Sequence, residues 1–301
     1  MEQAEQLFAA STTVDYSARP ILLFYGLSQA GRAVAAASTS AGSQEWRLSK
    51  HGIEARNLPQ KPLYKVTVAD QGWGSFTQLA ALLDSGSLPK GAPLGDIWAT
   101  LPDIASIGLG TADHKPKPAL RFSAEDDSHS KYQGAMVGWV RGVPWPSNSW
   151  PTEPEIIDYL STYPTLAGSD KPNLSHRHEV DPDALGHTRH DPYDKIADFL
   201  RAWPLPPGLD PWDGRTVPYR GDDDRWAFPV LGGSDRPLHP LLAWWAVLFA
   251  LSMLARYEPA SWTEHLDVDS SPDAVALETA LERALDTCPE LILQTMRRVS
   301  R

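Results

Sequence analysis

The stretch LHPLLAWWAVLFALSMLARYEP, residues 238–259, is the most apolar part of the chain and decides how the rest can be arranged. It carries no charged residue before Arg256. A membrane-spanning helix needs about 20 apolar residues, whereas residues 241–255 span only roughly 22 Å as a helix. Pro259 ends the helix, and no basic cluster marks a cytoplasmic flank. The stretch therefore predicts a helix that is apolar on every face because it lies at the centre of a soluble core.

Composition and charge restrict the classes of function. The 301 residues are enough for one large domain or two ordinary ones, and the net charge of −11 disfavours nucleic acid and anionic lipid as partners. The single cysteine, Cys288, excludes an intrachain disulfide and is typical of a reducing compartment. Acidic residues stand near the N-terminus, where a secretory leader has basic ones. We expect a cytoplasmic protein without a membrane partner.

The outer parts of the chain are predicted to be mostly helical. Gly26 and Gly31 lie inside the first long helix and indicate close packing against another helix, such as 241–256. A strand is expected between the first two of these helices, at 62–72. The predicted helices cover 17–38, 75–86, 93–108 with an interruption at Pro102, and 271–299 as two helices divided at Pro289.

The middle of the chain differs in composition, because prolines, aspartates and tryptophans crowd together from about 109 to 235. Its predicted elements are strands at 117–124, 134–142 and 225–231 and short helices at 154–164 and 192–204. The predicted fold class is mainly α with an α+β character. Residues 1–124 and 236–301 form a helical core, and residues 125–235 form an inserted Trp/Pro-rich, partly β region. Two sequential domains are the alternative.

Four histidines lie within fifteen residues and suggest a metal site. Imidazoles surrounded by carboxylates are ligands for zinc and similar ions. The segment also contains prolines and a glycine, offers no cysteine and has no strong helix to orient ligands, so a solvated loop is the competing interpretation. No phosphate-binding glycine motif and no G-x-S-x-G nucleophile motif occur. The sequence therefore predicts no cofactor, and the alternative is zinc or another divalent metal held by His176, His178, His187 and His190.

Polar residues beside the apolar helices are the remaining candidates for a site. Arg19 begins the first long helix, His51 precedes a glycine, and His239 and Arg256 stand at the two ends of the central helix. His239 and Arg256 would be roughly 25 Å apart on a straight helix, so they cannot serve one site together. Arg256 also suits a helix C-terminus. The candidate catalytic set is Arg19, His51 and Arg256, brought together from different helices.

Four blocks of the sequence resemble the YaaC-like family of bacterial proteins. They are RPILLFYGLSQAGRA (19–33), HG (51–52), LGDIWATLPDI (94–104) and HPLLAWWAVLFALSMLARYEPASW (239–262). The resemblance spans nearly the whole chain, lies mainly in the outer helical blocks, and implies a bacterial cytoplasmic setting without a defined activity. Where the family pattern has an asparagine, this chain has Gln29, which weakens a catalytic role for an amide there.

A helical shape similar to HEPN ribonucleases is a second resemblance. Their signature is an arginine followed, after four to six residues, by a histidine. None of the nine histidines has an arginine at that spacing; Arg47 and His51, for example, have three residues between them. The ribonuclease activity therefore does not follow from the sequence.

Two functions remain open. The first is a regulatory protein that binds a protein partner, as a component of a bacterial defence or stress system; the twelve tryptophans suit such a recognition surface, and they suit a core equally. The second is an enzyme that acts on RNA or nucleotides. The sequence leaves the oligomeric state open.

Overall fold

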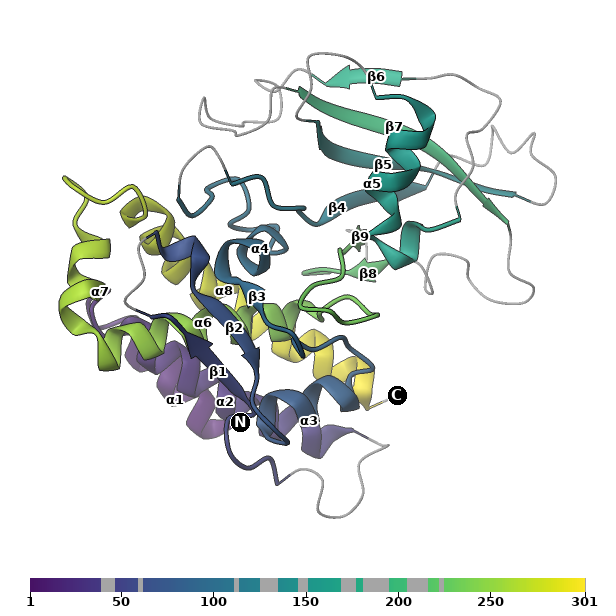
Figure 1. Ribbon diagram of the computed structural model, residues 1–301. Helices are drawn as coiled ribbons and strands as arrows, with labels where there is room; N and C mark the ends of the chain where they lie inside the picture. Colours follow the sequence, from purple (N-terminus) through teal and green to yellow (C-terminus); the bar gives the residue numbers. More distant parts are fainter. Residues whose placement is uncertain are drawn as a thin grey trace. The chain divides into compact units, whose positions relative to one another are not determined.

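The fold is described from a computed structural model of the chain (Figure 1). The residues that the structure describes are 1–38, 47–58, 62–110, 114–124, 135–145, 151–168, 177–180, 195–204, 216–221 and 225–300.

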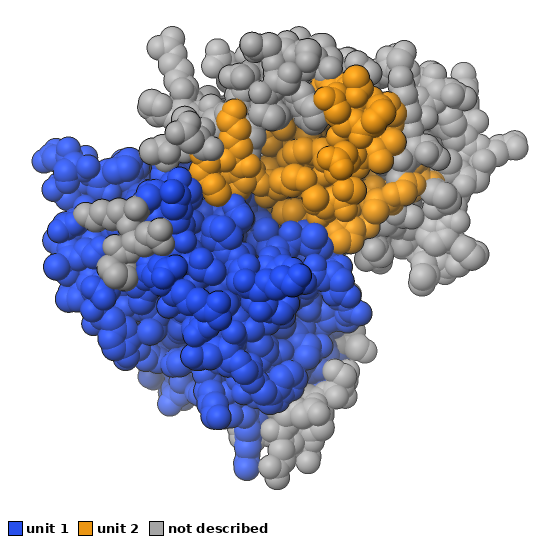
Figure 2. Space-filling view, in the orientation of Figure 1, with its two compact units in different colours: residues 1–111, 230–301 blue, residues 112–229 orange. Residues whose placement is uncertain are grey.

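The chain divides into two compact units (Figure 2). Unit 1 contains residues 1–111 and 230–301, and unit 2 contains the intervening residues 112–229. The predicted bounds of the insertion, 125–235, lie near those of unit 2, but strand β4 (Leu120–Ala124) belongs to unit 2 and not to the helical core. The predicted fold class is confirmed: the chain is mainly helical with antiparallel sheet, and the first and last parts of the chain share one helical unit.

Helix α6 (Pro240–Tyr257) is the centre of unit 1. By length and composition it meets the criteria for a membrane span, but 83% of its apolar window is buried inside the unit. It packs against α2 (Arg19–Ala37), α4 (Leu94–Ala99), α7 (Pro259–Leu266) and α8 (Ala274–Val299). Burial on all its faces explains why α6 is apolar all round, as the sequence predicts.

Two glycines let α2 approach its neighbours closely. A Cβ atom on Gly31 would lie 2.5 Å from Cζ3 of Trp245 on α6, so the predicted contact between these two helices is confirmed. A Cβ atom on Gly26 would instead meet the ring of Phe8 on α1 (Glu2–Ser11) at 3.2 Å. The two glycines therefore serve two different helix contacts.

A small antiparallel sheet completes unit 1. Its order is β1 (Ile53–Arg56), β2 (Thr67–Asp70) and β3 (Ala92–Pro93), with the turn η1 (Leu63–Lys65) before β2 and helix α3 (Ser75–Leu82) after it. The predicted strand 62–72 is thus shorter than expected, and the helical prediction for 93–108 holds only as far as α4.

The prediction of two helices in 271–299 is wrong, because α8 continues through Pro289. Proline costs about 3 kcal/mol in a helix interior. Here the stripe of buried residues runs on at helical spacing across the proline, so packing on both sides of it holds the helix together. The stripe comprises Ala284, Thr287, Cys288, Leu291, Ile292 and Thr295.

Unit 2 is built on a six-stranded antiparallel sheet with the order β6-β7-β5-β4-β9-β8. Helix α5 (Glu153–Ser161) and the turn η3 (Pro164–Leu166) pack with the apolar residues of strands β4, β5, β7 and β9 in one core. The predicted pairing of 117–124 with the strands near 134–142 and 225–231 is confirmed. The remaining strands are β5 (Ala135–Trp145), β6 (Arg177–Val180), β7 (Lys195–Pro204), β8 (Val217–Pro218) and β9 (Arg225–Ala227).

The predicted helix at 192–204 is wrong, because Lys195–Pro204 is strand β7. Phe199, Arg201 and Trp203 are buried at every second position, which is strand periodicity. Asp198 is also buried, and its carboxylate accepts hydrogen bonds at 2.9 Å from the Gly142 backbone N–H and at 2.8 Å from Arg141, where β5 bulges. Pairing with the long strand β5 therefore overrides the local helical preference of this segment.

Candidate functional site

The structure brings two of the three predicted site residues into one environment and separates the third. His51 and Arg256 interact electrostatically at the C-terminal half of α6. Arg19 lies at the first residue of α2 and has a different set of partners.

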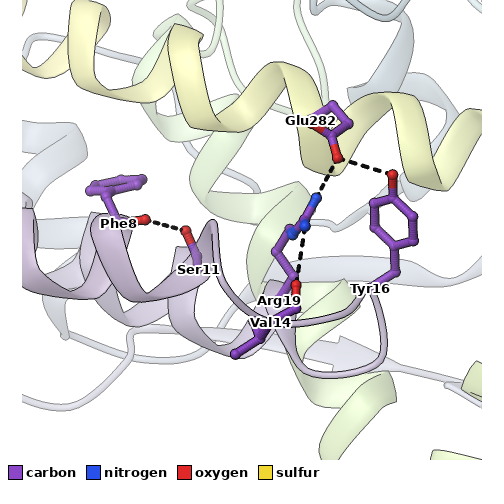
Figure 3. Close-up of polar contacts among 6 residues, drawn as sticks. All are labelled: Phe8, Ser11, Val14, Tyr16, Arg19 and Glu282. Atoms are coloured by element: carbon purple, nitrogen blue, oxygen red, sulfur yellow. Dashed lines mark hydrogen bonds and ion pairs between the residues drawn. The ribbon is translucent and has the colours of Figure 1, made fainter.

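Arg19 belongs to a partly buried ion pair inside unit 1 (Figure 3). Its guanidinium donates to Glu282 on α8 at 2.5 Å and to the carbonyl of Val14 at 3.0 Å, and it lies 4.6 Å from the ring centroid of Tyr16. The Tyr16 hydroxyl donates to the same Glu282 oxygen at 2.9 Å. Hydrogen bonds from Arg19 and Tyr16 lower the pKa of Glu282. With Arg19 only 9% exposed, this arrangement joins the start of α2 to α8.

His51 lies on a loop whose backbone is held in place on both sides. Lys50 and Gly52 both have left-handed backbone angles, with φ of 58° and 71°. A Cβ atom on Gly52 would lie 2.7 Å from the carbonyl carbon of Gly74, so the two backbones touch. The His51 carbonyl also accepts the N–H of Phe76 at 2.9 Å. Strained backbone of this kind often marks a functional position.

The His51 ring packs on one side against aromatic residues of the core and is exposed on the other. Its centroid lies 5.8 Å from those of Phe24 on α2 and Phe249 on α6. Burial, and then the positive charge of Arg256, lower the pKa of His51. Both effects favour the neutral imidazole.

Arg256 is held by two tyrosines. It donates to the hydroxyl of Tyr25 at 2.9 Å and to that of Tyr257 at 3.2 Å. Its guanidinium carbon also lies 5.0 Å from the Tyr257 ring centroid. We call the residues Tyr25, His51, Arg256 and Tyr257 the Arg256 cluster.

Trp73 is a further exposed residue on the neighbouring loop. Its side chain is 69% exposed, the highest value among the large hydrophobic side chains that the structure describes as exposed. The loop is pinned to residues 50–52 by backbone hydrogen bonds from Gln71 to Gly52 and from Ser75 to Lys50. Trp73 and His51 are therefore presented by two loops that are fixed to each other.

Sequence reasoning missed Tyr25, Tyr257 and Trp73. The two tyrosines stand inside the blocks 19–33 and 239–262, but nothing in the sequence shows that their hydroxyls meet Arg256. The glycines on both sides of Trp73 could have predicted its exposure, because two flanking glycines indicate a loop and not a core element.

A comparison with protein families gives a match over almost the entire chain. The model described as YaaC-like Protein matches residues 1–296. The chain belongs to the YaaC-like family. The predicted resemblance is thereby confirmed, while similarity to HEPN proteins is not shown. The search of curated proteins and the search of solved structures each found no match to the chain.

The other end of α6 has a structural histidine in this YaaC-like chain. Nδ1 of His239 accepts the backbone N–H of Leu241 at 3.1 Å and so caps the helix. Burial, and then the charge of Arg298, lower the pKa of His239 to about 3. His239 and Arg256 mark opposite ends of the helix, as the sequence predicts.

The predicted metal ligands lie largely outside the described part of this YaaC-like chain. His176, His187 and His190 are outside the described residues, and His178 is described only through the backbone of β6. Within the described ranges, no group of three or more His, Cys, Asp or Glu side chains is placed to hold a metal ion. The zinc site stays a prediction.

Unit 1 contains two further buried groups, the Asp273 carboxylate and the Cys288 thiol. Asp273, at the start of α8, accepts the N–H of Gly110 at 2.9 Å and lies 3.2 Å from Nδ1 of His265 on α7. This contact ties α7 and the loop at 110 to α8. Burial raises the pKa of the Cys288 thiol, so the thiol stays protonated and is a poor nucleophile.

Proposed function

We propose that this member of the YaaC-like family is a regulatory, partner-binding protein of the bacterial cytoplasm, acting in a defence or stress system. In this proposal the partner is a protein, and it contacts unit 1 at Trp73 and at the Arg256 cluster. The observation that best supports this proposal is the exposure of Trp73, which is 69% exposed on a loop fixed by backbone hydrogen bonds.

The residue types support binding in preference to stability. Tryptophan, tyrosine and arginine dominate the binding energy of protein interfaces. An exposed tryptophan contributes little to folding, whereas burying it against a partner removes a large apolar area from water. Because its loop is already ordered, Trp73 loses little conformational entropy on binding.

The test is capture of partners with purified wild-type chain, followed by reconstitution with the purified candidate partner. The variant Trp73→Ala removes the anchor. Val268→Ala is the matched control, because Val268 is also exposed, at 62%. We expect the Trp73 variant to weaken binding by at least about tenfold, as for an interface hot spot, and the control to bind as the wild type does.

Equal affinity of the Trp73 variant and the wild type for the reconstituted partner would reject this surface. Unfolding curves of both variants serve as a check on folding, because neither side chain is needed by the core.

An enzyme that acts on RNA or nucleotides is the second candidate function, and one observation favours it. A histidine with a lowered pKa beside an arginine can accept a proton near an anionic substrate. The test is incubation of the purified chain with total RNA and a panel of nucleotides. Turnover that is abolished by His51→Ala would favour the enzyme over the binding protein, and absence of turnover would remove this candidate.

A further inference from the structure

The Arg256 cluster has an excess of hydrogen-bond donors. Arginine carries five N–H donors and no acceptor, and two of them are used on the hydroxyls of Tyr25 and Tyr257. Each hydroxyl oxygen accepts from Arg256, so its own O–H proton remains available to donate. The remaining N–H groups of Arg256 and the two O–H groups therefore point to a ligand that supplies acceptors.

The positive charge of the cluster is not neutralised by the described part of unit 1. Arg256 forms no ion pair with a carboxylate among the described residues, in contrast to Arg19. Arg256 is likewise the charged group that affects the pKa of His51, and no acidic side chain in the described ranges offsets it.

A second arginine extends this surface along α2. Arg32 donates to Oε1 of Gln29 at 2.8 Å and to the carbonyl of Leu48 at 3.4 Å, both neutral groups. Gln29 stands one helical turn from Tyr25. The exposed face of α2 beside the His51 loop thus carries one more arginine that hydrogen-bonds to neutral partners.

We infer that the Arg256 cluster binds a phosphate group, with Arg256 and the hydroxyls of Tyr25 and Tyr257 as donors. A phosphate offers several acceptor oxygens and a double negative charge, which matches a planar guanidinium with two adjacent hydroxyl donors. The inference rests on the proposed function, since it names the chemistry that the same surface recognises.

His51 adds a second, pH-dependent contact. A bound anion opposes the effect of Arg256 and favours the protonated imidazole, so anion binding and protonation of His51 strengthen each other. The groups packed against the ring are Phe24, Phe249 and, as the charged one, Arg256. Anion affinity therefore rises as the pH falls through the pKa of His51.

The first experiment measures binding of inorganic phosphate to the full chain by isothermal titration calorimetry at constant ionic strength. The variants are Arg256→Gln, which removes the charge, and Tyr25→Phe, which keeps the ring and removes only the hydroxyl. Arg283→Gln is the control, because Arg283 is an exposed arginine on α8. We expect about tenfold weaker binding for Arg256→Gln, about threefold weaker for Tyr25→Phe, and wild-type affinity for the control.

Phosphate affinity that is the same in Arg256→Gln and in the wild type would overturn the inference, and so would the absence of phosphate binding to the wild type at millimolar concentration. Thermal unfolding of each variant shows that it is folded. Failure here leaves the proposed function testable, because partner capture with Trp73→Ala uses a different residue and a different readout.

Two further arms define the ligand. Adenosine monophosphate that binds more tightly than inorganic phosphate would identify a nucleotide as the source of the phosphate, and equal affinities would identify the phosphate group alone. Sulfate keeps its two charges at pH 5–8, so its binding isolates the titration of His51. We expect sulfate affinity to rise on acidification in the wild type and to stay flat in His51→Gln; parallel curves would overturn the role of His51.

Discussion

Arg19 at the start of helix α2 and Arg256 near the end of helix α6 both have tyrosine neighbours, but they play different roles. Arg19 lies against Tyr16, is 9% exposed and is neutralised by Glu282. Arg256 lies against Tyr25 and Tyr257, is exposed, and meets no carboxylate within the described ranges. A buried, neutralised arginine is a structural element, whereas an exposed one held only by neutral acceptors keeps its charge available for a ligand. The two arginines differ because Glu282 neutralises Arg19, whereas no carboxylate among the described residues neutralises Arg256.

The first expected effect is a difference in stability between the variants of these two arginines. Arg19→Gln removes a partly buried ion pair and leaves the Val14 carbonyl without its donor, so the free energy of unfolding should fall by about 2 kcal/mol. Because Glu282 is half-exposed and regains water, the loss stays below that of a fully buried pair. Arg256→Gln should change stability by less than about 0.5 kcal/mol. Urea unfolding of both variants measures this difference in the free energy of unfolding. Equal losses in the two variants would contradict the prediction.

The loop that presents His51 gives the next effect. Gly52→Ala places a Cβ atom 2.7 Å from the Gly74 backbone at a φ of 71°, so we expect a loss of roughly 1–3 kcal/mol and a displaced His51. Gly72→Ala is the control, because it also has a positive φ, of 62°, but no atom within 4 Å. A Gly52 variant no less stable than the Gly72 variant would show that the contact between the two loops is dispensable.

His239 extends the comparison to the other end of α6. Since its pKa is lowered to about 3, the folded chain binds fewer protons than the unfolded chain between pH 6.5 and 3. The stability contributed by the neutral His239 is therefore present above pH 6.5 and is lost on acidification, by at most roughly 1.4 kcal/mol per pH unit. His239→Asn keeps a capping acceptor and lacks the titration. We expect a shallower acid dependence of its unfolding free energy, and identical slopes would refute the lowered pKa.

The smallest effects are changes in pKa, measured by NMR titration. In Arg256→Gln the pKa of His51 should rise and still stay below 6.5, because burial is the larger cause of its lowering. In Arg19→Gln the pKa of Glu282 should rise, because the hydrogen bond from Arg19 is the main cause of its low value. Unchanged pKa values would mean that Arg256 does not lower the pKa of His51 and that Arg19 does not lower the pKa of Glu282.

The sequence predicts the central part of the fold well, because one pattern dominates it. Helix α6 is apolar on every face and buried within unit 1, and Gly31 marks its contact with α2. The failures occur where tertiary contacts override local preference. Strand β7 is stabilised by pairing with β5, and α8 continues through Pro289 because both sides of it are packed.

The candidate site was predictable in part. His51 and Arg256 can be selected from the sequence because polar residues beside an apolar core need a reason to be there. What the sequence cannot show is which partner each arginine meets, since Glu282 lies 263 residues from Arg19 and Tyr25 lies 231 residues from Arg256. The assignment of one arginine to the core and the other to the surface depends on those distant contacts.

The most direct test of this account is the thermal unfolding of wild type, Arg19→Gln and Arg256→Gln, each with and without phosphate at constant ionic strength. A ligand that binds only the folded state raises Tm. We predict that Arg19→Gln unfolds at a lower Tm and is still stabilised by phosphate, while Arg256→Gln unfolds like the wild type and gains much less from phosphate. An equal phosphate-induced rise in Tm for Arg256→Gln and wild type would contradict the account.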